Sequence, residues 1–284
     1  MKIGVLVESF RKPFADSLKE AARLGIQGLQ IYAKDGPVYD KMPVNEINEL
    51  KKIIAGEGLE VSALCGDFGC RMFYYPHEMR DEIEREKRVL ALAKELGTNI
   101  VTTHIGVVPE NFATKDFDNM YSVCKELADF ADSIDGFFAV ETGPEPSGRL
   151  KNFLDTLGSR GVGVNLDPAN LAMVIGEDAA EAVYNLRDYI VHTHAKDGRM
   201  IKPGDPRKLY VPAIAHVDPQ AWSDYIIELP LGDGEVRWEK YLNALNDIGY
   251  NGYLTIEREV GDHPAQDISK AVDFLRKVAA PYLK

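Results

Sequence analysis

The 284-residue sequence predicts an α/β fold, a single (β/α)8 (TIM) barrel with a long loop after the seventh strand. Short β-rich runs alternate with longer segments of helical periodicity eight times along the chain. Most of the β-rich runs are continuously apolar, as parallel strands covered by helices are. No shift in composition marks a domain boundary, and α/β barrels of about 250 residues fold as one unit. We therefore expect one domain over residues 1–284.

Each predicted strand is a short apolar run, and an amphipathic segment follows it as the predicted helix. The predicted strands are residues 2–7, 28–33, 61–65, 99–104, 137–141, 162–167, 189–194 and 253–257. The predicted helices are residues 14–24, 44–55, 79–96, 115–133, a short one from Leu150, 179–185, 238–248 and 267–278. Gly25 and Gly97 follow two of these helices, as expected for glycines at helix ends. Eight such units favour a closed barrel over an open doubly wound sheet.

The alternation is interrupted between the seventh strand and its helix, over residues 198–235. This segment contains five prolines, Pro203, Pro206, Pro212, Pro219 and Pro230. A connection of this length in a compact domain is usually a lid or a binding loop. Within it, Gly232-Asp233-Gly234 either turns the chain or exposes backbone N–H groups to a phosphate, and the turn is the favoured interpretation.

The charge balance and the cysteines restrict the partners and the compartment. Lysine and arginine number 33 and aspartate and glutamate 45, which gives a net charge of −12. An acidic surface repels phosphate backbones and anionic headgroups, so we expect neither nucleic acid nor a membrane as a partner. The apolar run 3–7 is too short for a signal-peptide core or a membrane span. Three cysteines without a CxxC pair indicate a reduced, cytoplasmic compartment.

Polar residues end most of the predicted strands, where the active site of a (β/α)8 barrel lies. They are Glu8, His104, Glu141, Asp167, His192, His194 and Glu257. One such residue can merely hydrate the mouth of a barrel, but a set that converges on one axis favours a functional site. For Glu8 alone, an ion pair with a neighbouring lysine is the favoured interpretation.

Four of these residues form a candidate metal site. Glu141, Asp167, His194 and Glu257 supply three carboxylates and one imidazole. This donor set suits one divalent ion, Mn²⁺, Mg²⁺, Co²⁺ or Zn²⁺. Without a cation the three carboxylates would repel one another, and some of their pKa values would rise. His192 and His194 share one strand face, so one can be the ligand and the other a layer below. For His192, a hydrogen-bonded core histidine is the favoured interpretation.

Five short motifs at the ends of strands four to eight carry a family resemblance. They are Thr103-His104-Ile105-Gly106, Val140-Glu141-Thr142-Gly143, Asn165-Leu166-Asp167-Pro168-Ala169-Asn170, His192-Thr193-His194-Ala195-Lys196-Asp197 and Ile256-Glu257-Arg258-Glu259. In this order, over essentially the whole chain, the sequence resembles the xylose isomerase-like barrel superfamily and, within it, the sugar phosphate isomerase/epimerase group. Five motifs in register are specific for the family, whereas they say little about the substrate.

The resemblance implies one divalent metal held by Glu141, Asp167, His194 and Glu257, with the second histidine of the pair as the ligand. It also implies that Glu141 and Glu257 act as acid and base on opposite faces of the substrate. The implied activity is a metal-dependent sugar or sugar phosphate isomerase or epimerase. Such an enzyme abstracts a proton next to a carbonyl through a metal-stabilised enediolate. A positioned carboxylate contributes ~10²- to 10⁴-fold to this proton transfer.

The expected substrate contacts are His104, Asn170, Lys196 and Arg199, and several positions around them depart from the ketose epimerases of the group. Asn170 stands where those enzymes have a histidine, three positions after the metal aspartate. Met200 stands where they have an arginine, with Arg199 one position earlier, and Ser147 stands where they have a second glutamate. The sugar, and whether it is phosphorylated, therefore stays open.

Three other classes of function compete with the isomerase. Lys196 and Asp197 resemble the subgroup with inosose dehydratase-like members, so a metal-dependent dehydratase of a keto-polyol is the alternative. The DNA-repair endonuclease branch is disfavoured because the chain is acidic and its His216-Val217-Asp218 reverses that branch's Asp-x-His pair. A non-catalytic sugar binder has no need of two spare acid–base carboxylates. A small carbohydrate is the expected partner, and a homo-oligomer is left open.

Overall fold

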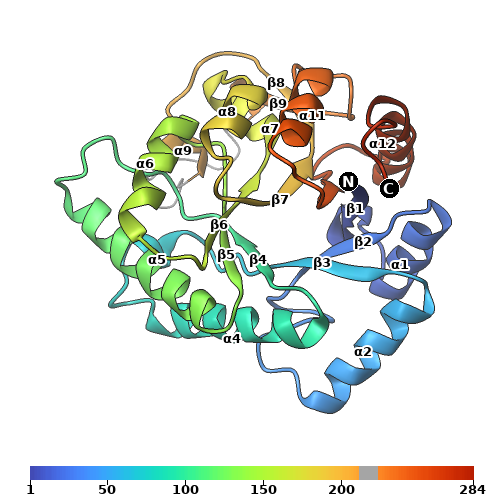
Figure 1. The fold of residues 1–284 in the computed structure, drawn as a ribbon, viewed down its shortest axis with the longest axis horizontal. Helices are drawn as coiled ribbons and strands as arrows, with labels where there is room; N and C mark the ends of the chain where they lie inside the picture. Colours follow the sequence, from blue (N-terminus) through green and yellow to red (C-terminus); the bar gives the residue numbers. More distant parts are fainter. Residues whose placement is uncertain (211–222) are drawn as a thin grey trace.

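Eight parallel strands close a barrel in the computed structural model, which describes residues 1–210 and 223–284. The strands are β1 (Lys2–Leu6), β2 (Gly28–Tyr32), β3 (Glu60–Cys65), β4 (Ile100–Thr103), β5 (Phe137–Glu141), β6 (Val162–Leu166), β7 (Ile190–Ala195) and β10 (Tyr253–Ile256). Around the ring they follow the order β1-β10-β7-β6-β5-β4-β3-β2 (Figure 1). β1 pairs in parallel with both β2 and β10, so the sheet has no free edge. The predicted (β/α)8 barrel is confirmed.

Helices connect the strands and cover the outside of the barrel (Figure 1). They include α1 (Phe14–Arg23), α2 (Val44–Gly56), α4 (Arg80–Leu96), α5 (Lys115–Ser133), α6 (Ser147–Leu157), α8 (Ala179–Asn185), α11 (Trp238–Asp247) and α12 (Pro264–Val278). Two helices start earlier than the sequence predicts. α6 begins directly after Pro146 rather than at Leu150. α12 begins at Pro264 rather than at Asp267, because proline is well suited to the first position of a helix.

The core lies between the strands and the apolar stripes of the helices. In α5, for example, the side chain of Thr114 accepts a hydrogen bond from Phe117 N at 3.2 Å and caps the helix. The buried residues Met120, Val123 and Leu127 recur three or four positions apart and face the barrel.

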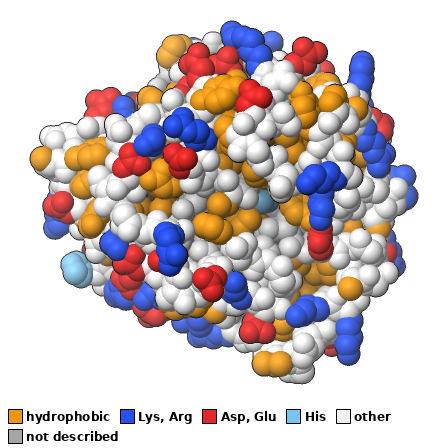
Figure 2. Space-filling model, in the orientation of Figure 1, with side chains coloured by type: hydrophobic (Ala, Val, Ile, Leu, Met, Phe, Trp, Pro, Cys, Tyr) orange, Lys and Arg blue, Asp and Glu red, His pale blue; other side chains and the backbone are white. Residues whose placement is uncertain are grey.

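Among the described residues, no helix combines the length and the apolar character that a membrane crossing requires. Figure 2 shows positive and negative side chains interspersed over one face.

The connections after β6 and β7 contain structure that the periodicity did not predict. After β6 the chain forms α7 (Pro168–Asn170) and a π-helical turn, η2 (Leu171–Ile175), before α8. After β7 the predicted loop contains α9 (Pro206–Tyr210) and a two-stranded antiparallel sheet of β8 (Asp197–Met200) and β9 (Ile226–Leu229). The part of this loop that holds Pro212, His216 and Pro219 lies outside the described residues. α3 (Arg71–Tyr74), after β3, is a further short helix that was not predicted.

Candidate metal centre and active site

The four predicted ligands meet at the carboxyl end of the barrel. Glu141 is the last residue of β5, Asp167 and Glu257 directly follow β6 and β10, and His194 lies near the end of β7. One ligand atom from each lies within 4.8 Å of the others, and all four side chains are buried. Strand ends far apart in the sequence thus bring three carboxylates and one imidazole together, as the strand-end pattern predicts.

The orientation of His194 fits a metal ligand. Its Nδ1 lies 3.6 Å from Glu141 Oε1, 3.4 Å from Asp167 Oδ2 and 3.3 Å from Glu257 Oε2. Burial would lower the pKa of His194, but the negative charges of Glu257 and Glu141 raise it well above its usual value. The same negative charges would attract a cation placed among the carboxylates. The lone pair of His194 Nδ1 would then be the fourth donor to that cation.

Gln30, a residue that sequence reasoning missed, fixes this orientation. The Gln30 amide nitrogen donates to Thr102 Oγ1 at 2.8 Å, which leaves its Oε1 facing His194 Nε2 at 2.9 Å. This contact favours a hydrogen on Nε2, which Asn165 Nδ2 also approaches at 3.1 Å, and Nδ1 is the nitrogen turned to the carboxylates. The signal for Gln30 was present, since it is the polar residue in the middle of the buried strand β2.

Glu141 is held at both oxygens. Oε1 accepts from Asn170 Nδ2 at 3.0 Å and lies 3.2 Å from His104 Nε2, while Oε2 accepts from Asn165 Nδ2 at 3.1 Å. Burial disfavours the charged carboxylate, yet the positive charges of His104 and His194 hold the pKa of Glu141 well below its usual range. Two of the predicted substrate contacts, His104 and Asn170, therefore touch the ligand set directly.

A glycine allows Asn170 to reach Glu141. Gly143 has φ of +137°, and a Cβ there would lie 2.3 Å from Asn170 Cβ and 2.7 Å from the Tyr210 hydroxyl. Any side chain at this position would displace one of these neighbours, so the Glu-Thr-Gly motif serves close packing behind Glu141.

Glu257 has a different neighbour, the buried ammonium group of Lys196. Lys196 Nζ donates to Glu257 Oε2 at 2.9 Å and also bonds Glu259 Oε2 at the rim. Burial alone would raise the pKa of Glu257, but the positive charges of Lys196 and His194 lower it to about 2. Lys196 therefore lies beside the ligand set with a salt bridge on each side, and its role as a substrate contact stays a prediction.

His192 lies one layer below His194 and is a hydrogen-bonded core histidine, as predicted. Its Nδ1 lies 2.9 Å from Asn165 Oδ1, and its Nε2 lies 3.0 Å from Thr255 Oγ1. Burial, with the nearby His194, lowers its pKa to about 3. Asn165 therefore links the two layers, since its amide nitrogen donates to Glu141 while its oxygen faces His192.

A cavity of about 290 Å³ opens in front of the four ligands. It is lined by Asp67, Gly69, Cys70, His104, Glu141, Asn170, Lys196, Tyr210, Glu257 and Glu259. Asp67 was not predicted; its Oδ2 lies 3.1 Å from His104 Nδ1 and so orients the imidazole that contacts Glu141. Arg199 is not among the described residues that line the cavity. It is exposed on β8, where it pairs with Ile227 of β9, so the structure does not bring it to the other predicted contacts.

Two further expectations are settled by the structure. Asp197 accepts hydrogen bonds from Gly232 N at 3.0 Å and Trp238 Nε1 at 2.8 Å through Oδ2, and from Val236 N at 3.2 Å through Oδ1. The Gly232 segment is therefore the predicted turn, anchored to Asp197. The lysine partner predicted for Glu8 was wrong: Tyr32 N donates to its Oε1 at 3.3 Å, and its buried Oε2 has no partner among the described residues.

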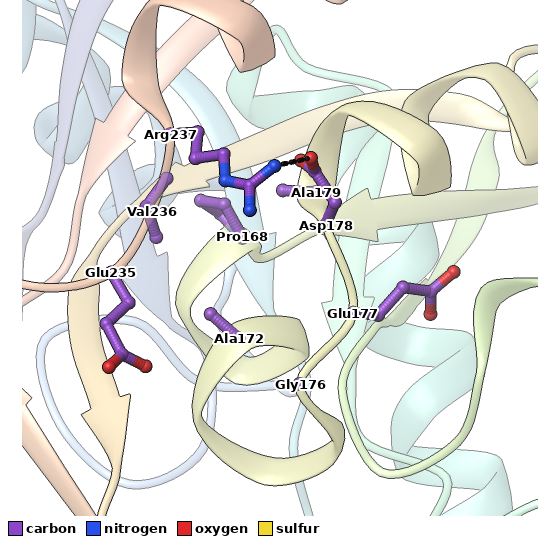
Figure 3. Close-up of a pocket in the computed structure, with 9 residues that line it drawn as sticks. All are labelled: Pro168, Ala172, Gly176, Glu177, Asp178, Ala179, Glu235, Val236 and Arg237. Atoms are coloured by element: carbon purple, nitrogen blue, oxygen red, sulfur yellow. Dashed lines mark hydrogen bonds and ion pairs between the residues drawn. The ribbon is translucent and has the colours of Figure 1, made fainter.

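A second cavity, of about 390 Å³, lies between the segment that follows β6 and the residues that lead into α11. Figure 3 shows Arg237 reaching across it to Asp178, with a separation of 3.1 Å. Glu177, also in its lining, accepts a hydrogen bond from Ser147 N at 2.8 Å through its Oε2. Ser147, which replaces the second glutamate of the epimerases, therefore contributes to helix packing here. This cavity contains none of the four clustered ligands.

Comparison with known proteins identifies the family to which this barrel belongs. The family model described as the xylose isomerase-like TIM barrel matches residues 18–278. The chain belongs to this family. It is 24% identical over 179 residues to an uncharacterized protein of Methanocaldococcus jannaschii, over 59% of this chain and 53% of the relative. The chain thus spans about half the length of the curated relative it matches.

Solved structures share the xylose isomerase-like fold over nearly the whole chain. A xylose isomerase domain protein from Planctomyces limnophilus has a TM-score of 0.75 at 23% identity, covering 93% of this chain and 92% of that one. A D-tagatose 3-epimerase-like protein has a TM-score of 0.74 at 19% identity, covering 99% and 98%. A probable 3-DHS dehydratase from Bacillus anthracis has a TM-score of 0.72 at 17% identity, covering 97% and 98%. At these identities the likeness shows the fold alone.

Proposed function

We propose that the chain, as one barrel domain over residues 1–284, is a divalent-metal-dependent isomerase or epimerase of a small carbohydrate. The observation that carries this proposal is the pair Glu141 and Glu257, two buried carboxylates in one ligand cluster that both line one 290 Å³ cavity. Two carboxylates in one small site equip it to remove a proton at one side of a substrate and return it at another. The cavity lies just below the range of ligand pockets, about 300–1,000 Å³, which suits a ligand as small as a single sugar.

Glu141, Asp167, Glu257 and His194, through its Nδ1, would hold the ion. Mostly oxygen donors with one nitrogen suit Mn²⁺, Mg²⁺, Co²⁺ or Zn²⁺. A bound divalent ion supplies polarisation of a substrate carbonyl, which acidifies the neighbouring C–H group. Three converging carboxylates, together with a histidine nitrogen turned toward them by Gln30, support this assignment.

We assign proton removal to Glu257. Its Oε2 is held by Lys196, whereas its Oε1 accepts no hydrogen bond from the residues that the structure describes and is free to take a proton. Glu141 has both oxygens held, and His104, 3.2 Å from its Oε1, stabilises it as the charged carboxylate. β5 and β10 are separated by two strands of the ring, so the two glutamates approach the cavity from different sides.

A dehydratase of a keto-polyol is the second candidate, and Lys196 is the observation that favours it. Its ammonium group lies beside Glu257 in the cavity wall, so an acid and a base are adjacent. In a dehydration, Glu257 would remove the same proton, and Lys196 would transfer a proton to the departing β-hydroxyl, which leaves as water. The two candidates therefore share the first step and differ in the product.

Product analysis tests the proposal. Mg²⁺-loaded protein is incubated with a panel of ketoses and keto-inositols, and the products are identified by proton NMR. An epimer or an isomer, absent with Glu257→Gln and present with the exposed control Glu95→Gln, is the expected result. A new enol or diketone with loss of a carbinol signal would replace the isomerase with the dehydratase. Full turnover by Glu257→Gln would contradict the assigned base.

A further inference from the structure

We infer that this cavity selects an uncharged ketose or keto-polyol and rejects sugar phosphates and sugar acids. The inference rests on the proposed function, whose substrate class it narrows. Three observations support it. The cavity lining is rich in negative charges, the nearby cations are already paired with carboxylates, and backbone N–H groups after the seventh barrel strand already donate to a carboxylate of the protein.

The described lining is rich in acids. Four carboxylates contribute to it, those of Asp67, Glu141, Glu257 and Glu259. Asp167 adds a fifth negative charge immediately behind them in the ligand cluster. A divalent ion brings two positive charges to three carboxylate ligands, so even the loaded centre does not turn the cavity positive.

The cation in the described lining, Lys196, is already neutralised. Its ammonium nitrogen lies 2.9 Å from Glu257 Oε2, bonds Glu259 Oε2, and lies 3.9 Å from Glu228 Oε2. An incoming phosphate would have to displace a carboxylate from a buried ammonium group, which costs the energy of a buried ion pair. His104, the other basic group, is likewise flanked by Asp67 and Glu141.

Arginine, the residue best suited to bind phosphate or carboxylate, does not line the cavity within residues 1–210 and 223–284. Arg258, next to Glu257 in sequence, is bound to Glu228 at 2.6 Å and to Asp267 at 2.9 Å. Residues 211–222 contain neither lysine nor arginine in their sequence.

In the loop after β7, backbone N–H groups donate to a carboxylate of the protein. In (β/α)8 barrels, phosphate is frequently bound by backbone N–H groups in the loops after the last two strands. Here the N–H groups of Gly232 and Val236 donate to Asp197, at 3.0 and 3.2 Å. Gly234 packs so closely that a Cβ there would lie 2.0 Å from Asp197 Oδ1. Asp197 thus occupies two backbone N–H groups of this loop that could otherwise bind a phosphate.

A comparison of matched substrates tests this inference. Mg²⁺-loaded protein is assayed with D-fructose, D-fructose 1-phosphate, D-fructose 6-phosphate, a keto-inositol and a sugar acid. Because like charges repel strongly in a buried site, kcat/KM for the phosphates and the acid is expected to be at least ~100-fold below that for the best uncharged compound. Inorganic phosphate at millimolar concentration should not compete with that compound.

The rim carboxylate Glu259 provides the variant. Glu259→Gln releases one partner of Lys196, so the ratio of kcat/KM for a phosphate to that for the uncharged sugar should rise about tenfold. Glu95→Gln, the same change on the exposed face of α4, should leave the ratio as it is. A phosphate turned over as well as the free sugar, or an unchanged ratio in Glu259→Gln, would overturn the inference and leave the proposed function standing. Turnover of no compound in the panel would overturn both.

Discussion

Two histidines on β7, two residues apart, lie in neighbouring layers of the barrel and have opposite character. His192 is surrounded by the neutral partners Asn165 and Thr255, and burial lowers its pKa to about 3. His194 faces three carboxylates, whose charge raises its pKa well above the usual value. The same residue type on the same strand face is therefore a core group in one layer and a prospective ligand in the next. Partners from other strands, not β7 itself, decide the role.

Among tests of the difference between the two histidine layers, the largest effect on metal affinity is expected at the carboxylates around His194. Asp167→Asn preserves an oxygen that can cap α7, as Oδ1 does now for Ala169 N at 2.8 Å, but removes the negative charge. Loss of a direct ligand should lower Mn²⁺ affinity by more than the ~10- to 100-fold typical of an outer-shell partner. A titration of free Mn²⁺ by electron paramagnetic resonance measures this. Affinity equal to that of the exposed control Asp273→Asn would remove Asp167 from the ligand set.

The next effect is expected at Gln30, which orients His194 without facing the cavity. Gln30→Met has similar size but no acceptor for His194 Nε2, so the imidazole loses its fixed orientation. Mn²⁺ affinity should fall ~10- to 100-fold, as for other outer-shell partners. The same titration checks it, and an unchanged affinity would show that the hydrogen bond at 2.9 Å does not govern the ligand.

A smaller effect on the metal, with a larger one on folding, is expected in the His192 layer. His192→Leu leaves Asn165 Oδ1 and the Thr255 hydroxyl without their partner. The free energy of unfolding should fall by about 1–3 kcal/mol for these unpaired groups. Urea denaturation measures this loss. Should Mn²⁺ affinity drop as far as in Gln30→Met, the two layers would not be functionally distinct.

The smallest effect concerns Glu8, a carboxyl at the same end of the barrel but outside the ligand cluster. Burial raises its pKa from 4.5 to about 7, so the folded protein binds this proton more tightly than the unfolded chain. Its contribution to stability is therefore complete below pH 4.5 and is lost as the pH rises toward about 7. Glu8→Gln should flatten the pH dependence of the melting temperature in this window. An identical profile in the variant would show that Glu8 does not titrate there.

The barrel and the four clustered residues were predictable because both follow from local patterns. Apolar runs that end in Glu141, Asp167, His194 and Glu257 give the strands, and closure of the ring then brings their carboxyl ends together. The alternation placed His192 and His194 on one strand face in successive layers, and the family resemblance indicated the second histidine as the ligand. The strands and their clustering need only the alternation of side chains along a strand and the topology of a parallel barrel.

The partners that tune the site were not predictable, because they depend on register between strands. Gln30 reaches His194 across 164 residues of sequence, and Asp67 reaches His104 from the loop after β3. The expected contact Arg199 fails to reach the cavity because β8 pairs with β9 and leaves the arginine exposed. No local pattern distinguishes that small sheet from a loop. Such partners can still be suspected from the sequence, because each is a polar residue inside an apolar strand, as Gln30 and Asn165 are.

The proton transfer assigned to Glu257 is tested most directly by hydrogen exchange with solvent. Mg²⁺-loaded protein is incubated in D₂O with the best uncharged substrate of the panel, and deuterium at the carbon next to the carbonyl is followed by proton NMR. We expect deuterium at that carbon with the unaltered protein and none with Glu257→Gln. An isomer or epimer formed with no deuterium at that carbon would contradict the account, because the hydrogen would then move within the substrate without passing through a carboxylate that exchanges with water.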